Sequence, residues 1–281
     1  MLEENFELRH MDRLAVPCTL RLPSSKGKFR LVVVGHGFLG FKDWGFLPHL
    51  CHQLTLSGFA TLCFTHALAG IRENPHELTD LNALSSNSTT QELKDWELVL
   101  DAILCQRLPL SNTLRINAFG VMGHSRGGSY AILMARQTPQ IQSVVTWGGI
   151  STFQRFDRAA QAKWREQGRL EVGRTPSGKP IEMHVNALNA LERNEARLDV
   201  IRAVRELTIP VLFLHGREDK RVCWKESQKL WNCSLRDLTE FQLIELAGHT
   251  FRTPHPFQSP SQPLTEAIRR TIRWFERTLR E

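Results

Sequence analysis

The sequence has no apolar stretch approaching the roughly 20 residues that a membrane-spanning helix needs. Its first residues, Met1 to Glu7, are acidic and lack the basic segment, apolar segment and cleavage site of a secretory signal. The six cysteines include no close Cys-x-x-Cys pair, so we expect neither a disulfide framework nor a zinc site, only reduced, buried thiols. These absences predict a cytoplasmic protein without membrane contacts.

Blocks of like charge and nucleotide motifs are also missing. The formal net charge is +7, but the 36 Lys and Arg are spread along the chain, so no nucleic-acid partner is expected. Residues 264–279 are rich in arginine, yet their apolar residues recur at helical spacing, which predicts an amphipathic helix packed on the core. The stretch 173–179 resembles a phosphate loop, but Pro180 stands where Ser or Thr is required. We expect no metal and no organic cofactor.

Short apolar runs, rich in β-branched residues, alternate with helical patterns along the chain. This alternation is typical of an α/β fold with a mostly parallel sheet. Six buried strands are predicted over residues 31–34, 59–64, 116–122, 143–147, 209–215 and 241–246. Two earlier segments, 6–9 and 15–22, are expected to add antiparallel edge strands, which makes a sheet of eight strands.

The connecting segments predict helices with recognisable ends. Residues 46–56 run to Gly58, which is typical of a helix terminus. The tetrapeptide Thr89-Thr90-Gln91-Glu92 has capping-box spacing before an apolar periodic run that continues to Leu104. Both segments fit crossover helices between parallel strands.

The segment 151–206 is far longer than an ordinary strand-to-helix connection. Helical patterns over 186–195 and 198–204 suggest that it has a structure of its own. We interpret it as a small helical cap insertion within a single domain that spans residues 1–281.

The strongest functional motif lies where a predicted strand meets a predicted helix. The run Gly120-Val121-Met122-Gly123-His124-Ser125-Arg126-Gly127-Gly128 leads from an apolar strand into Gly-x-Ser-x-Gly, and a helical pattern follows over 130–136. In such a nucleophile elbow the serine occupies a strained turn, and small neighbours are needed because the two backbones approach closely. Ser125 is therefore the candidate nucleophile.

A serine hydroxyl needs a base, and the base needs an orienting acid. The last two predicted strands end in loops that contain Asp219 and His249. Loops at the carboxyl edge of a parallel sheet converge, so Ser125, Asp219 and His249 can meet, and their chain order suits this type of elbow. Glu218 is a rival for the acid, and Asp219 is favoured by its position in the motif.

The tetrahedral intermediate needs two oxyanion donors. We assign them to the backbone N–H of Arg126, which follows the nucleophile, and of Phe38, in the loop after the first buried strand. Three side chains at the same sheet edge are candidate walls of the substrate pocket: His36, His66 and Trp147.

Several motifs together resemble the α/β-hydrolase superfamily, and the resemblance extends from Leu31 to Phe275. The runs 36–45 (HGFLGFKDWG), 123–128 (GHSRGG), 248–251 (GHTF) and 73–81 (ENPHELTDL) are similar to a bacterial subgroup related to dienelactone hydrolases, cinnamoyl esterases and acyl-peptidase catalytic domains. The resemblance implies an α/β-hydrolase fold with the cap inserted at 151–206. It also implies hydrolysis of carboxylic esters.

One departure concerns residues 64–70, which lack the Asp- or Asn-Gly-x-Gly pattern of many relatives, so details of the pocket are not transferred. The expected substrate is a small-molecule acyl ester, and the expected state is a monomer or homodimer. Two alternatives stay open. A peptidase or amidase would use the same triad, and a binding protein on a hydrolase fold usually lacks a triad residue.

Overall fold

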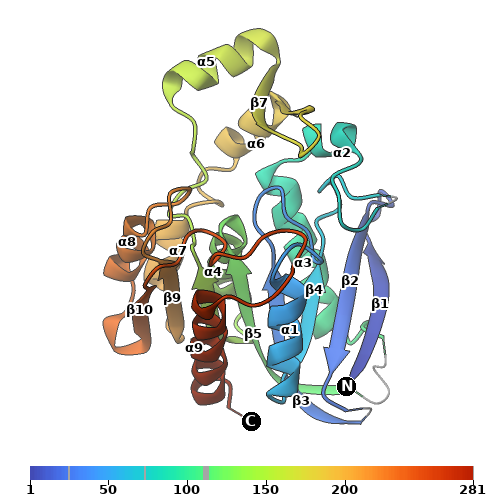
Figure 1. Cartoon of the computed structure of the whole chain (residues 1–281), viewed down its shortest axis with the longest axis vertical. Coiled ribbons are helices and arrows are strands. Elements are labelled where there is room, and N and C mark those ends of the chain that lie inside the picture. Colours follow the sequence, from blue (N-terminus) through green and yellow to red (C-terminus); the bar gives the residue numbers. More distant parts are fainter. Residues whose placement is uncertain (25, 73, 110–113, 281) are drawn as a thin grey trace.

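The computed structural model describes residues 1–24, 26–72, 74–109 and 114–280. Glu73, which begins one of the runs compared above, lies outside the described residues. Within the described part of the chain, eight strands form one sheet in the order β1-β2-β4-β3-β5-β6-β9-β10 (Figure 1). Their bounds are β1 Leu2–Arg9, β2 Ala15–Leu22, β3 Gly27–Gly35, β4 Ala60–Phe64, β5 Leu114–His124, β6 Ile141–Trp147, β9 Val211–Gly216 and β10 Thr239–Ile244.

The central strands are parallel, because helical crossovers join them, and they are covered on both faces. In β3, the run from Leu31 to Val34 is fully buried, which explains its unbroken apolar sequence. The eight-stranded, mostly parallel sheet predicted from sequence is confirmed. One detail differs: β2 is antiparallel as expected but lies between β1 and β4, so β1 alone is the edge at that end.

Two layers of helices cover the sheet and divide the core into two clusters of apolar side chains. Helices α1 (Leu47–Leu56) and α9 (Gln262–Thr278) pack on one face. Helices α3 (Thr89–Leu104), α4 (Arg126–Gln137), α7 (Val200–Glu206) and α8 (Lys225–Cys233) cover the other. The amphipathic helix predicted at the C-terminal end is α9, whose apolar stripe contacts the sheet as its periodicity indicates.

Helix α3 begins one residue earlier than the capping-box pattern indicates. Ser88 is the N-cap, and its Oγ accepts the N–H of Gln91 at 3.2 Å. Glu92 does not reach back to the helix start, because its side chain turns into the interior and only 3% of the residue is exposed. The sequence pattern was therefore correct for the helix and wrong for the role of Glu92.

The long segment 151–206 contains strands as well as helices. Helix α5 (Arg158–Gln167), the hairpin β7 (Arg169–Arg174) and β8 (Pro180–His184), and helix α6 (Asn186–Arg193) lie beyond one end of the sheet (Figure 1). They share a small apolar cluster of Trp164, Met183 and Leu188, against which Phe38 packs. The purely helical cap expected from sequence is thus corrected to a mixed one. The segment predicted as its last helix is α7, which packs in the main core instead.

None of the helices in the described ranges combines the length and apolar character that crossing a membrane would require.

All six cysteines lie in described ranges and are unpaired; Cys18, Cys51 and Cys63 are buried as predicted, whereas Cys105 and Cys223 are exposed. The expectation of buried thiols was therefore wrong at these two positions, where flanking apolar residues gave no guide to burial.

Candidate active site

Ser125 occupies the junction between β5, which ends at His124, and α4, which begins at Arg126. Its φ of 56° and ψ of −123° form a conformation that costs a non-glycine residue about 1–3 kcal/mol. The backbones are close here: a Cβ on Gly123 in β5 would lie 2.2 Å from the carbonyl carbon of Gly127 in α4, and a Cβ on Gly127 would lie 2.5 Å from the carbonyl oxygen of His36 in the loop after β3. The elbow therefore requires glycine after the serine, and the half-buried serine stays accessible at the carboxyl edge of the sheet.

His249 and Asp219 form a short hydrogen bond at the same edge. Nδ1–H of His249 donates to Oδ2 of Asp219 at 2.6 Å, while Oδ1 accepts the backbone N–H groups of Arg221 and Val222, each at 2.9 Å. Because the carboxylate is held by its own loop, it fixes the ring orientation and the tautomer of His249. Nε2 of His249 is then the basic nitrogen.

His215, the next-to-last residue of β9, gives Asp219 a second side-chain donor. Its Nε2 lies 3.2 Å from Oδ2 of Asp219 and 2.9 Å from the carbonyl oxygen of Val222, so this nitrogen carries the proton. Burial would raise the pKa of Asp219, but the hydrogen bonds from His215 and His249 outweigh it and hold that pKa well below its usual range. Asp219 is therefore ionised whenever the protein is folded near neutral pH.

Glu218, the rival acid, takes no part in this arrangement. Its side chain is exposed and pairs with Arg252 at 3.1 Å. Of the two adjacent carboxylates, only Asp219 turns toward His249. This agrees with the preference for Asp219, although the roles of the triad residues remain predictions.

His124 is a neighbour of the site that the motif did not identify, since it fills a variable position of Gly-x-Ser-x-Gly. Its Nε2–H donates to the carbonyl oxygen of His249 at 2.8 Å, and the two rings are 4.6 Å apart. Burial, followed by repulsion from His249, lowers the pKa of His124 to about 3. A neutral His124, which directly precedes the proposed nucleophile, therefore connects the elbow to the loop of the proposed base.

The loop after β3 passes close to the elbow. A Cβ on Gly37 would lie 2.9 Å from Cβ of Ser125, so only glycine allows this approach. The carbonyl oxygen of Gly37 accepts the N–H of Gly40 at 3.1 Å and Nδ1–H of His36 at 2.8 Å. Phe38 follows directly, which brings both predicted oxyanion residues, Phe38 and Arg126, next to Ser125; their role as donors stays a prediction.

The three pocket candidates are not equivalent. Trp147 is 0% exposed, packs in the core and donates its indole N–H to Thr271 at 2.9 Å, so it is corrected from pocket wall to core residue. His36, in the loop after β3, and His66, which follows β4, are both buried, and their rings are 4.6 Å apart. His66 also lines a cavity of about 1180 Å³. That cavity lies between the β1–β2 hairpin and residues 65–82 and contains none of the three predicted triad residues.

Comparison with known proteins identifies sequence relatives of this chain. Residues 107–272 match the sequence profile of the family described as BAAT / Acyl-CoA thioester hydrolase C terminal. The chain is also 26% identical, over 217 residues, to 2,6-dihydropseudooxynicotine hydrolase of Paenarthrobacter nicotinovorans. That match covers 75% of this chain and 50% of the relative, so the chain spans about half the length of this curated protein.

Solved structures agree with the fold. Est1E from Butyrivibrio proteoclasticus, in a complex with ferulic acid, superposes with a TM-score of 0.73 at 16% identity and covers 97% of this chain and 98% of its own. The esterase domain of a Rhodothermus marinus protein superposes with a TM-score of 0.65 at 17% identity and covers 99% of both chains. At such low identity the likeness shows a common fold and leaves the substrate undetermined.

Proposed function

Because the chain belongs to the BAAT / acyl-CoA thioester hydrolase C-terminal family, within the α/β-hydrolases, we propose that this hydrolase cleaves carboxylic esters through an acyl-enzyme on Ser125. One observation carries the proposal: a histidine held by a carboxylate at 2.6 Å shares a sheet edge with a serine in a strained elbow. This combination of nucleophile, base and orienting acid is what acyl transfer at neutral pH requires.

In the proposed reaction, Oγ of Ser125 attacks the acyl carbonyl carbon while Nε2 of His249 takes the hydroxyl proton. Asp219 stabilises the imidazolium that forms and keeps Nε2 directed at the reacting atoms. His249 then gives the proton to the leaving alcohol, and the carbon–oxygen bond of the ester breaks. Water repeats the sequence on the acyl-enzyme, releases the carboxylic acid and regenerates the serine.

Negative charge develops on the carbonyl oxygen during both attacks. The N–H groups of Phe38 and Arg126 are proposed to stabilise it, and Arg126 is also the first residue of α4, where helix N–H groups add a favourable field. Removing one such donor typically costs about 10²–10³-fold in kcat. No step of this mechanism needs a metal or an organic cofactor.

Acyl-CoA thioesters are a second candidate substrate, because the matched family carries them in its description. The attack on the carbonyl carbon is the same. A thiolate leaves more easily than an alkoxide, since thiols ionise near pH 8.5. Both ester classes therefore have to be tested with the same set of variants.

The first test is hydrolysis of p-nitrophenyl esters and acyl-CoA thioesters of increasing chain length. The wild-type protein is compared with Ser125→Ala and with a control, Ser177→Ala, at an exposed position in the β7–β8 turn. We expect Ser125→Ala to lose hydrolysis and Ser177→Ala to retain it. Equal hydrolysis by all three proteins would refute the nucleophile, and cleavage of p-nitroanilides alone would favour an amidase.

A further inference from the structure

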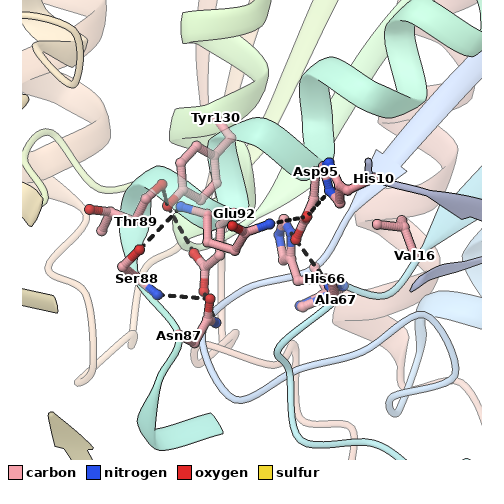
Figure 2. Close-up of polar contacts among 12 residues, drawn as sticks. His10, Val16, His66, Ala67, Asn87, Ser88, Thr89, Glu92, Asp95 and Tyr130 are labelled. Carbon is pink, nitrogen blue, oxygen red and sulfur yellow. Dashed lines mark hydrogen bonds and ion pairs between the residues drawn. The ribbon is translucent and has the colours of Figure 1, made fainter. Parts of the chain in front are cut away.

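Two buried carboxylates lie on one face of α3, and the proposed mechanism uses neither. Glu92 and Asp95 are three residues apart, with 3% and 0% of their surfaces exposed. Burying a carboxylate costs several kcal/mol unless charges and hydrogen bonds compensate it. Figure 2 shows two groups of partners, one around each carboxylate. Both groups extend toward the oxyanion residues.

Glu92 connects α3 to the residue after the proposed nucleophile. It accepts the hydroxyl of Tyr130 at 2.8 Å and the amide of Asn87 at 2.9 Å, and both of its oxygens lie 3.3 Å from a guanidinium nitrogen of Arg126. The guanidinium of Arg126 stacks over the ring of Phe38, with its carbon 4.2 Å from the ring centroid. Glu92 thus forms an ion pair with the guanidinium of Arg126, and the contact of this guanidinium with the ring of Phe38 links the side chains of the two proposed oxyanion residues.

Asp95 connects α3 to the segment that follows β4. Its Oδ2 accepts Nδ1–H of His66 at 3.1 Å and the N–H of Ala67 at 3.0 Å, and Oδ1 accepts Nε2–H of His10 at 2.7 Å. Burial would raise the pKa of Asp95, but these donors outweigh it and lower that pKa. The ionised carboxylate therefore fixes the segment that follows β4.

The same chain of hydrogen bonds continues to the oxyanion loop. The backbone N–H of His66 donates to Nε2 of His36 at 3.1 Å, and Nδ1–H of His36 donates to the carbonyl oxygen of Gly37. Burial, and then repulsion from His66, hold the pKa of His36 well below its usual range, so the ring stays neutral and can accept this bond. The network therefore ends at Gly37, the residue before the proposed oxyanion donor Phe38.

We propose that Glu92 and Asp95 are positioning residues that hold the oxyanion hole from its two sides, Glu92 through the Arg126–Phe38 stack and Asp95 through His66 and His36. The inference rests on the function proposed above. Oxyanion donors stabilise charge without reorganisation only if they are fixed beforehand, and a displacement of about 1 Å can cost 10²-fold in rate. Glu92 acts by its charge, since a neutral amide would leave the partly buried guanidinium of Arg126 without this counter-ion.

The test compares Glu92→Gln and Asp95→Asn with Asp101→Asn, a control at an exposed position of the same helix. The readouts are kcat and KM for a p-nitrophenyl ester, affinity for an alkyl boronic acid that forms a tetrahedral adduct with the serine, and thermal unfolding. We expect Glu92→Gln to lower kcat about 10–100-fold, with KM little changed, and to weaken boronate binding by the same factor. Asp95→Asn should act in the same direction, and Asp101→Asn should match the wild type.

A merely structural role would lower kcat with the folded fraction and leave boronate affinity per active site unchanged; this result, or wild-type values in Glu92→Gln, would overturn the inference. If Glu92→Gln does not fold, Phe38→Leu removes the stacking partner at a half-buried position and should lower kcat and boronate affinity in the same ratio, whereas unchanged values would overturn the proposal. A wild-type protein with neither ester hydrolysis nor a boronate adduct would instead refute the proposed function. A wild-type enzyme that shows both, beside an equally active Glu92→Gln, refutes only the positioning role.

Discussion

Acidification should destabilise the folded protein through His124. This side chain is 7% exposed, donates to the backbone of His249 and lies with its ring 4.6 Å from that residue's ring. Burial first, and the neighbouring His249 second, lower its pKa from 6.5 to about 3. A proton on His124 would therefore be buried next to a second histidine, so the native state resists taking it up.

The sign follows from proton uptake. Between pH 6.5 and about 3 the unfolded chain binds a proton at this histidine and the native protein does not, so stability falls as the pH drops through this window. The complete difference corresponds to roughly 5 kcal/mol at this one site. Between pH 7 and pH 5 the loss is roughly 2 kcal/mol, a large share of the stability of an ordinary domain.

Urea unfolding at pH 7 and pH 5 measures this loss directly. His124→Gln is the informative variant, because glutamine places an N–H near the position of Nε2 and does not titrate. We expect the wild type to lose roughly 2 kcal/mol more than His124→Gln between the two pH values. His76→Gln, at an exposed position, should behave as the wild type. Equal losses in the wild type and His124→Gln would refute the reasoning, because other titrating groups cancel in the comparison.

Three further outcomes are expected. Asp219→Asn should lower kcat by about 10⁴-fold with little change in KM, as measured by ester hydrolysis, because the amide turns His249 to the wrong tautomer; a loss confined to KM would contradict this. His215→Phe should lower kcat with little change in KM, since Asp219 loses a hydrogen-bond donor and orients His249 less firmly; an unchanged kcat would exclude this link. Gly127→Ala should cost about 1–3 kcal/mol in urea unfolding and abolish hydrolysis, because its Cβ would lie 2.5 Å from the carbonyl oxygen of His36; an active, equally stable variant would mean that the elbow is looser than described.

The cap contacts the loop after β3 through Phe38. Phe38 packs against the cap cluster of Trp164, Met183 and Leu188, so the loop that carries a proposed oxyanion donor also contacts the inserted segment. A shift of the cap would therefore displace Phe38 and the proposed oxyanion loop. This contact gives a physical reason why acyl-chain preference has to be measured with the intact chain.

Features that depend on residues close together in the chain were predictable from the sequence. The apolar run at Leu31 to Val34 predicts a strand buried on both faces, and the periodicity over 264–279 predicts the helix observed as α9. The elbow around Ser125 was also recognisable, because Gly123 and Gly127, which permit the close approach of strand and helix, flank the serine in the chain. Local propensity, patterning and turn chemistry all agree in these segments.

Contacts between residues far apart in the chain became visible only in the folded structure. Glu92 has the spacing of a helix cap, yet it is buried because Tyr130 and Arg126 approach it from α4. Trp147 ends strand β6 near the site edge, but the packing of α9 places it in the core. Burial, pairing and pKa shifts depend on which distant groups meet, and a linear pattern does not contain that information. The chain order of Ser125, Asp219 and His249 could therefore be recognised in the sequence. The side chains that hold these three residues in place could not.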